Sequence, residues 1–451
     1  MKEIKINFKE SSRGLSVKFN DKNYDIVFPR TVWKEYPKDI KAVWIDNFAL
    51  LSTICSPLVA GVQAVEYNTS LPIFKPLFYK MVLNSMPSAT EDYAIPTKKA
   101  IKQFKKIRYI FKDNKIKKPS YKSEKATEEK GAIVPLSCGK DSLLTLAICN
   151  EIGLNPAAIY INDTVDPVEN EIVIRFCKKL STDRNIVINF VTNNIEKLND
   201  FRFWNKTESS LGYSHMMTGF CFIALPFSHY YKAKYIIPGD EKNMDWSFIN
   251  KEDYKAWPSE DQTSQWIGKQ NNMIRLMTSN KVSVTSLVRP LTSIAITKIL
   301  HSRYSEFARY EISCYNLSEK TRERWCHNCP TCVTLSLFML ANGINPKNVG
   351  LGALLSKKYE KFYRLFNGEK IDCYEKSKEA RDQQMLAFYL AYKNKARGYL
   401  IEKFKKRFLS EATRREDELR KKFFKVYKAN IPKEIKRDVV SIFKEELKEL
   451  V

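Results

Sequence analysis

The sequence has few cysteines for its length, no recognisable secretory leader and no uninterrupted apolar run. Ten cysteines in 451 residues do not suit a disulfide-stabilised scaffold, because such scaffolds are small and dense in cysteine. Residues 1–5 alternate charged and apolar side chains, which is not the pattern of a signal peptide. The most apolar stretch, residues 48–65, is broken by polar residues, a proline and a glycine, so no membrane span is expected there. These absences favour a cytoplasmic protein without membrane contact.

Acidic residues are also in deficit. The chain has 76 lysines and arginines against 51 acidic residues, which gives a formal net charge of +25. An anionic partner such as a nucleotide, a nucleic acid or an acidic protein fits this charge, although a generally lysine-rich composition produces the same value without a polyanion. A hydrophobic content of 44% supports a packed core in one large domain or in two to three smaller ones.

The pattern of apolar residues changes along the chain. Residues 1–30 contain three short alternating runs, which predict an antiparallel β unit, and the proline-interrupted residues 39–83 predict several helices. From residue 132 onward, short apolar runs alternate with helical patterns, so we expect a parallel sheet with helices on both faces. The predicted fold class is α/β, a Rossmann-like sheet with a small N-terminal α+β domain and a helical C-terminal region. The predicted boundaries are 1–115 for the N-terminal domain, 116–131 for a linker, 132–353 for the central domain and 354–451 for the helical region.

A small-residue loop follows the first strand of the central domain. The apolar residues 132–136 predict a buried strand, and residues 143–148 predict a helix. Between them, the loop and the helix N-terminus would present backbone N–H groups to a phosphate, and Lys140 would add a cation. The loop residues are Ser137, Cys138, Gly139, Lys140, Asp141 and Ser142.

This loop resembles the S-G-G-K-D-S motif of the PP-loop ATP pyrophosphatases and lacks the spacing of a Walker loop. Cys138 replaces the first glycine, and we expect it to crowd the loop. The resemblance implies a PP-loop (HUP-type) fold that binds ATP and cleaves it between the α and β phosphates. Lys140 and Asp141 would then be catalytic, with Asp141 helping to hold Mg²⁺.

Four cysteines occur close together later in the chain. Cys314, Cys326, Cys329 and Cys332 have the spacing C-x11-C-x2-C-x2-C, which suits a tetrahedral Zn²⁺ site of structural type. An iron–sulfur cluster satisfies the same ligand count, and His327 is expected to be a bystander. The other cysteines are expected in the apolar core, namely Cys55, Cys149, Cys177, Cys221 and Cys373.

The loop and the cysteine cluster together resemble 7-cyano-7-deazaguanine synthase, the QueC family, over about residues 133–343. The resemblance implies adenylation of a carboxylate such as 7-carboxy-7-deazaguanine, followed by transfer of ammonia to give an amide and then a nitrile. Gly239 and Asp245 match its strand-end glycine and downstream aspartate. Lys298, in a segment that begins at Arg289, would contact phosphate or carboxylate. Residues 240–286 lack the family's usual Tyr-Pro-Asp-Cys-Arg-Pro run and are rich in Trp, Gln and Asn, so the substrate itself stays open.

Two alternatives remain open on the sequence. The charge and the basic run at 403–428, which contains interleaved aromatic residues, suit a tRNA-modifying PP-loop enzyme of thiolation or lysidine type. Extended QueC-like proteins also occur in anti-phage defence systems, where the partner is a macromolecule. The same run is equally typical of an amphipathic helix whose aromatic residues pack in the core, and we favour that interpretation.

Overall fold

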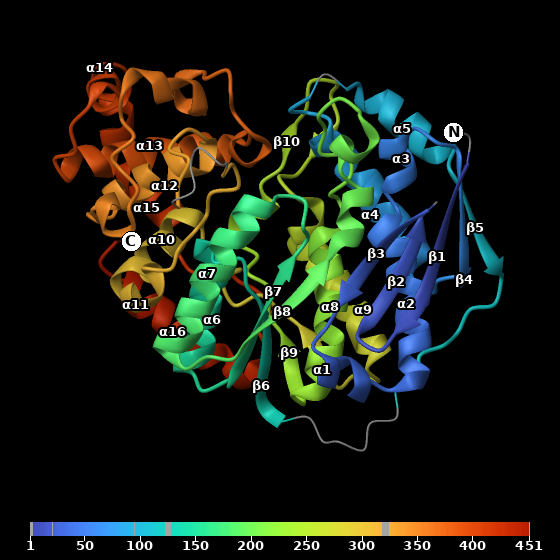
Figure 1. Cartoon of the computed structure of the whole chain (residues 1–451). Coiled ribbons are helices and arrows are strands. Elements are labelled where there is room, and N and C mark those ends of the chain that lie inside the picture. Colours follow the sequence, from blue (N-terminus) through green and yellow to red (C-terminus); the bar gives the residue numbers. More distant parts are fainter. Residues whose placement is uncertain (1–2, 20, 94, 122–127, 318–323, 451) are drawn as a thin grey trace.

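The strands of the protein form one large sheet in a computed structural model that describes residues 3–19, 21–93, 95–121, 128–317 and 324–450. The ten strands are ordered β12-β9-β6-β7-β8-β3-β2-β1-β4-β5 (Figure 1). A separate two-stranded ribbon pairs β10, Phe248–Ile249, with β11, Lys255–Ala256. The strands of the large sheet are β1 Glu3–Ser11, β2 Gly14–Phe19, β3 Lys22–Val27, β4 Ala64–Ser70, β5 Arg108–Asp113, β6 Glu128–Pro135, β7 Pro156–Asn162, β8 Ile188–Asn193, β9 Ala233–Ile236 and β12 Ser283–Val284.

Five of these strands form the parallel half of the sheet. β12, β9, β6, β7 and β8 run parallel to one another, which confirms the predicted α/β class with a Rossmann-like sheet. The helices are α1 Arg30–Glu35, α2 Lys38–Thr53, α3 Ser56–Ala60, α4 Lys75–Ala89, α5 Thr97–Lys105, α6 Lys140–Glu151, α7 Pro167–Arg184, α8 Met216–Tyr230, α9 Ser264–Met277, α10 Ser293–Ser302, α11 Ser305–Ala308, α12 Pro330–Ala341, α13 Lys378–Lys393, α14 Tyr399–Arg414, α15 Glu416–Phe423 and α16 Lys433–Leu447.

The N-terminal strands extend this sheet. β1, β2 and β3 form the predicted antiparallel unit, and β3 pairs antiparallel with β8, with Ile26 opposite Asn193. β4 and β5 then add to the free edge of β1 in parallel. The expectation of helices throughout 39–83 was wrong at β4, and α5 and β5 were not predicted at all. Both strands are parallel and pair only with distant segments, so their local sequences carry a weak signal.

The strand after the predicted linker begins earlier than expected. Part of the linker, residues 122–127, lies outside the described residues, and β6 starts at Glu128 rather than at residue 132.

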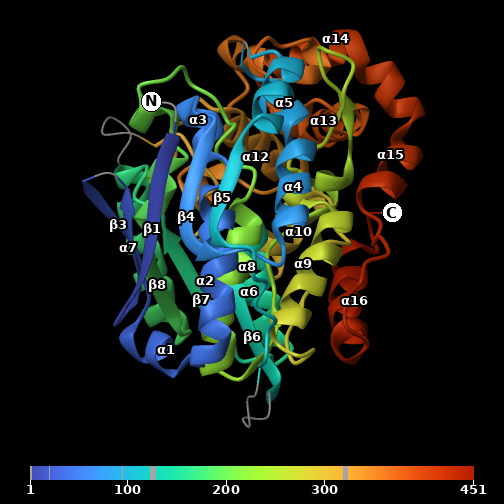
Figure 2. The ribbon, with the colours of Figure 1, turned by 90° about the vertical axis from the view of Figure 1, so that its right-hand side faces the viewer.

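Alternate side chains of the central strands enter two different cores. Ala132 and Val134 of β6 pack in one hydrophobic cluster, and Ile133 packs in the other. Helices α6, α7, α10 and α12 cover the first face, and α2, α4, α8 and α9 cover the second (Figure 2). Because both faces of the parallel strands are covered, ligand access is left to the strand ends.

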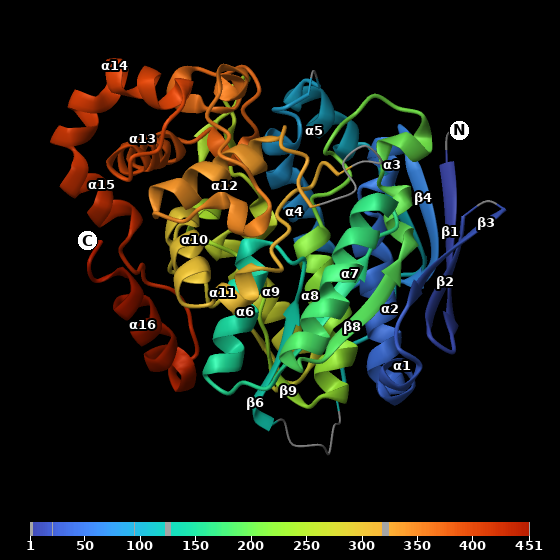
Figure 3. The same cartoon turned by 60° about the vertical axis from the view of Figure 1, so that its left-hand side comes forward.

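The C-terminal region is helical, as predicted, and packs through its aromatic residues. Phe404, Phe423 and Phe424 are fully buried, and the aromatic rings of Phe388 and Phe404 stack at 5.8 Å. These contacts place α13–α15 against the first core, on the side of the molecule opposite the N-terminal strands (Figure 3). The aromatic residues of the basic run therefore belong to the core, which was the interpretation we favoured.

One segment has the length and hydropathy of a membrane span. It covers Lys38–Ala60, and 89% of its apolar window is buried inside the structure. It is therefore a core helix pair, α2 and α3.

Candidate active site and metal centre

The loop between β6 and α6 turns sharply at Cys138. Its φ of +57° is left-handed, a conformation that favours glycine and costs other residues about 1–2 kcal/mol. The Cys138 side chain is fully buried, and its Sγ lies 3.4 Å from Sγ of Cys177 on α7. The expected crowding of the loop therefore does not occur, because the thiol points into the core.

Serine hydroxyls hold the turned loop. The Gly139 N–H donates to Ser137 Oγ at 3.3 Å, and the Lys140 N–H donates to Ser313 Oγ at 3.2 Å. The hydroxyls of Ser137 and Ser142 lie 3.2 Å apart at the start of α6. These small polar side chains and backbone amides form the kind of concave, donor-rich turn that binds phosphate.

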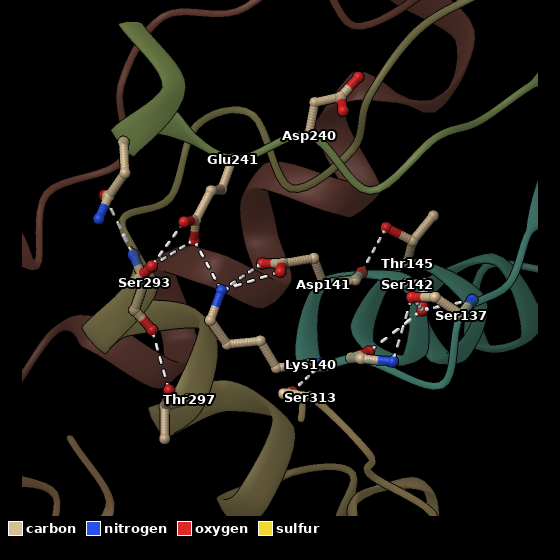
Figure 4. Close-up of polar contacts among 12 residues, drawn as sticks. Ser137, Lys140, Asp141, Ser142, Thr145, Asp240, Glu241, Ser293, Thr297 and Ser313 are labelled. Carbon is tan, nitrogen blue, oxygen red and sulfur yellow. Dashed lines mark hydrogen bonds and ion pairs between the residues drawn. The ribbon is translucent and has the colours of Figure 1, made fainter. Parts of the chain in front are cut away.

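Lys140 is held by two carboxylates (Figure 4). Its Nζ lies 2.8 Å from Asp141 Oδ1 and 3.0 Å from Glu241 Oε2, and Glu241 also accepts the Ser293 hydroxyl at 2.6 Å. Burial and the nearby Glu241 carboxylate raise the pKa of Asp141 to about 7, although Lys140 opposes this shift. The two carboxylates raise the pKa of Lys140 against the effect of burial, so this side chain is a cation at neutral pH.

Gly239 allows the strand end to approach this loop. A Cβ at Gly239 would lie 2.9 Å from both the carbonyl carbon of Asp141 and the backbone N of Ser142. Asp240 follows, and in the described part of the chain neither of its carboxylate oxygens has a hydrogen-bond partner. The Asp240 side chain is fully buried and points away from Lys140 in Figure 4, and burial raises its pKa to about 8.

Arg289 fixes the segment that follows Gly239. It is 5% exposed, its Nη1 donates to the carbonyl of Glu241 at 2.6 Å and to that of Gln262 at 2.7 Å, and its Nη2 pairs with Asp245. The resemblance therefore pointed to two residues, Asp245 and Arg289, that are partners in space. Their ion pair positions Glu241 beside Lys140.

A cavity of about 420 Å³ opens in front of the loop. Five of the six loop residues line it, as do Gly239 and Cys314, whereas Cys138 is buried behind the loop. Lys298 is half-buried on α10 and is not among the lining residues; Ser293, one helical turn or so earlier, reaches the cavity instead. The lining residues that were not predicted include Glu169, Glu241, Ser293, Ser313, Tyr315, Asp372, Tyr374 and Glu375.

The acidic end of the cavity comes from the region after α12. Asp372 caps a 3-10 turn over Cys373–Glu375, and Glu375 accepts a hydrogen bond from Gln384 at 2.6 Å. Burial and the Asp372 carboxylate raise the pKa of Glu375 to about 8, and burial raises the pKa of Asp372 to about 6. No local motif marks these residues, which are more than 200 positions from the loop. Cys373 was expected in the apolar core and is instead half-buried at this rim. Its thiol donates to the carbonyl of Pro258 at 3.4 Å.

The four cysteines come together beside the cavity. Their sulfur atoms all lie within 4.8 Å of one another, with Cys314–Cys329 at 4.0 Å and Cys326–Cys332 at 3.8 Å. Backbone N–H groups donate to three of the sulfurs, as in the bond from Cys332 N to Cys329 Sγ at 3.4 Å. Donors of this kind stabilise thiolates, and the group can bind one metal ion. His327 lies apart, with Nε2 3.3 Å from the carbonyl oxygen of Gly350.

Comparison with models of known protein families and with curated proteins gave no match.

Proposed function

We propose that the protein is a cytoplasmic ATP-dependent ligase of the PP-loop type. In this proposal it adenylates a carboxylate, releases pyrophosphate and transfers ammonia or an amine to the acyl group, in the manner of the QueC family. The observation that carries the proposal is the convergence of the S-C-G-K-D-S loop, Gly239 and the four-cysteine cluster on one cavity. These segments lie far apart in the sequence, so their meeting at one cavity does not follow from the spacing within each motif.

The chemistry needs positioning and charge stabilisation rather than a side-chain nucleophile. A carboxylate oxygen of the substrate attacks the α-phosphorus of ATP, and pyrophosphate leaves. The amine nitrogen then attacks the acyl carbon, AMP leaves, and the amine loses a proton as the amide forms. Loop amides and the Ser137 and Ser142 hydroxyls would bind phosphate oxygens together with Lys140. Glu375, whose pKa of about 8 keeps it mostly protonated at neutral pH, would accept this proton through its ionised fraction, which grows as the pH rises toward 8.

The charge of the cavity favours a divalent cation as the cofactor of this reaction. Five carboxyl groups line it and, among the described residues, Lys140 is its sole basic side chain. A triphosphate would be repelled by these groups unless a cation compensated them. Asp141 and Glu241 would hold Mg²⁺, which supplies charge neutralisation to the phosphates. Lys140 pairs with both carboxylates in the structure, and once they bind the cation its ammonium group would be free to pair with a phosphate of the nucleotide.

Product analysis tests the proposal. The protein is incubated with ATP, Mg²⁺, ammonium and 7-carboxy-7-deazaguanine, and AMP and pyrophosphate are quantified. We expect AMP only when the acid is present, and about a hundredfold less with Lys140→Ala, the loss typical of removing one preorganised charge donor. Lys436→Ala, an exposed lysine on α16, is the matched control and should behave as wild type. Absence of AMP from folded, metal-loaded protein with every acid tried would refute the proposal.

We infer that the cysteine cluster holds zinc. Four thiolates around one ion at a Zn–S distance of about 2.3 Å are separated by about 3.8 Å, close to the 3.8 and 4.0 Å found here. An iron–sulfur cluster spreads its ligands over several iron atoms and holds them farther apart. Elemental analysis should give about one zinc per chain and a colourless protein. Stoichiometric iron with visible absorption would contradict the inference.

A tRNA-modifying PP-loop enzyme is the second candidate, favoured by the net charge of +25. The same assay separates the two candidates, since this enzyme would release AMP with tRNA and without the deazaguanine acid. A component of a defence system that modifies a macromolecule would likewise release AMP only with its partner present.

A further inference from the structure

The densest basic surface in the described part of the chain lies near the N-terminal edge of the sheet and not in the C-terminal region. α5 and the edge strand β5 carry seven exposed basic side chains within fifteen residues. We call this group the α5–β5 basic surface, and it consists of Lys98, Lys99, Lys102, Lys105, Lys106, Arg108 and Lys112.

The helix presents its lysines on one face because the opposite face is buried. Ala100 and Phe104 are fully buried, and the Phe104 ring stacks on Tyr79 at 4.7 Å. At the N-terminus, the backbone N–H groups of Thr97 and Lys98 donate to Glu252. The helix is therefore fixed at both its start and its apolar face, and it holds the lysines in a preformed array.

Acidic neighbours act on these charges only at longer range, as Glu252 does on Lys98 and Glu3 on Arg108. Among the described residues, none of the seven side chains has an acidic partner within ion-pair distance. The basic residues of the C-terminal helices differ, because many pair internally: Lys403 with Glu360 at 2.7 Å, and Lys422 with Asp382 at 3.2 Å. The C-terminal run is thus partly neutralised by ion pairs within the fold, whereas the α5–β5 basic surface keeps more of its charge available to a partner.

The segment that leads into the α5–β5 basic surface contacts the rim of the cavity. The segment before α5 contacts the cavity rim, since the Asp92 carboxylate accepts the Cys373 N–H at 3.3 Å and pairs with Lys376 at 2.6 Å. Asp372 and Tyr374, on either side of Cys373, line the cavity. Figures 1 and 3 both show α5 at the same end of the molecule as α12, which borders the cavity.

We propose that the α5–β5 basic surface binds the sugar–phosphate backbone of a nucleic acid. Lys98 and Lys105 are about 10 Å apart along the helix axis, at about 1.5 Å per residue. Over that distance one strand of a duplex presents about three phosphate charges, at one per 3.4 Å or so, which matches the row formed by Lys98, Lys102 and Lys105. The proposal does not depend on the ligase activity.

Fluorescence anisotropy tests the proposal with full-length protein and three labelled probes of mixed sequence: a short RNA strand, an RNA duplex and a DNA duplex. The test variant is Lys98→Gln, Lys102→Gln and Lys105→Gln combined. The matched control removes three exposed lysines from α16, as Lys433→Gln, Lys436→Gln and Lys444→Gln combined. Figures 1 and 3 place α16 far from α5. Thermal unfolding of both variants establishes that they fold.

The expected result is binding by wild type that weakens steeply between about 50 and 200 mM salt. For the α5 variant, the slope of log affinity against log salt should fall by about 2 with the single strand and by about 3 with the duplexes, and affinity near 0.1 M salt should fall about a hundredfold. The α16 variant should keep the wild-type slope, and the three probes show which nucleic acid is preferred. Equal losses in both variants, no loss in the α5 variant, or binding confined to polyglutamate or to phosphatidylserine vesicles would overturn the proposal.

Discussion

Gly239→Ala is expected to displace the loop at residues 137–142 while leaving the fold intact. The added Cβ would lie 2.9 Å from two backbone atoms, the carbonyl carbon of Asp141 and the N of Ser142, and 3.1 Å from the Asp141 carbonyl oxygen. Ordinary contact to carbon needs about 3.5 Å or more, so β9 and the start of α6 must separate by about half an ångström. Overpacking of this kind costs about 1–3 kcal/mol, because backbone atoms cannot rotate away as a flexible side chain can.

The matched control is Gly268→Ala in α9, where an added Cβ meets no atom within 4 Å. Alanine in a helix interior is worth about 0.5–1 kcal/mol over glycine, so this variant should be more stable than wild type. Chemical denaturation measures both free energies of unfolding, and AMP release measures the effect on the loop. We expect Gly239→Ala to lose about a hundredfold in kcat/KM, the scale of a small misplacement of reacting groups. Wild-type stability and turnover in Gly239→Ala would refute the packing argument.

Three further predictions follow from buried groups. The buried ion pair with Glu196 raises the pKa of His215 to about 10. Because the folded state holds this proton to a higher pH than the unfolded state, the ion pair's contribution to stability is complete below about pH 6.5 and is lost as the pH rises through 10. The slope of unfolding free energy with pH should differ between wild type and His215→Gln by up to about 1.4 kcal/mol per pH unit in this window. Asp240→Asn should gain stability over wild type as the pH rises from about 4 to 8, since burial holds the Asp240 carboxyl protonated, and equal pH profiles would contradict this. Cys329→Ser should lower both the metal content and the melting temperature, because the remaining three thiols cannot complete a tetrahedral site; unchanged metal content would exclude Cys329 as a ligand.

The parts of the site that could be predicted from the sequence are those built by short contiguous segments. The loop at 137–142 and the C-x2-C-x2-C turn are local, because the chain itself brings the backbone amides or the sulfurs together. The prediction that Lys298 would reach the site was wrong because it depended on how a helix packs. A helical residue's direction depends on how the helix packs, and α10 turns Ser293 rather than Lys298 inward.

The parts that could not be predicted depend on distant segments. β3 joins the N-terminal strands to β8 through two paired positions, and no local pattern signals that edge contact. Asp372 and Glu375 reach the cavity because the C-terminal helices pack on the first core and carry the preceding turn with them. Cys138 is a different case, since the glycine-like φ of the loop was foreseeable from the motif, but the packing of its thiol in the core beside Cys177 was not.

A metal ion at the four-cysteine cluster would be expected to affect the loop at residues 137–142 directly. Three consecutive residues have three different roles: Ser313 accepts the Lys140 N–H, Cys314 belongs to the cluster, and Tyr315 lines the cavity with 52% of its surface exposed. The Ile312 N–H also donates to the carbonyl of Cys138 at 2.7 Å. Loss of the ion would release Cys314 and, with it, the contacts that hold both sides of the turned loop. Metal removal should therefore weaken ATP binding as well as stability. A chelated protein that stays folded but no longer gains thermal stability from added Mg²⁺ and ATP would show this coupling. If the chelated protein keeps the full thermal stabilisation by Mg²⁺ and ATP, the two sites are independent.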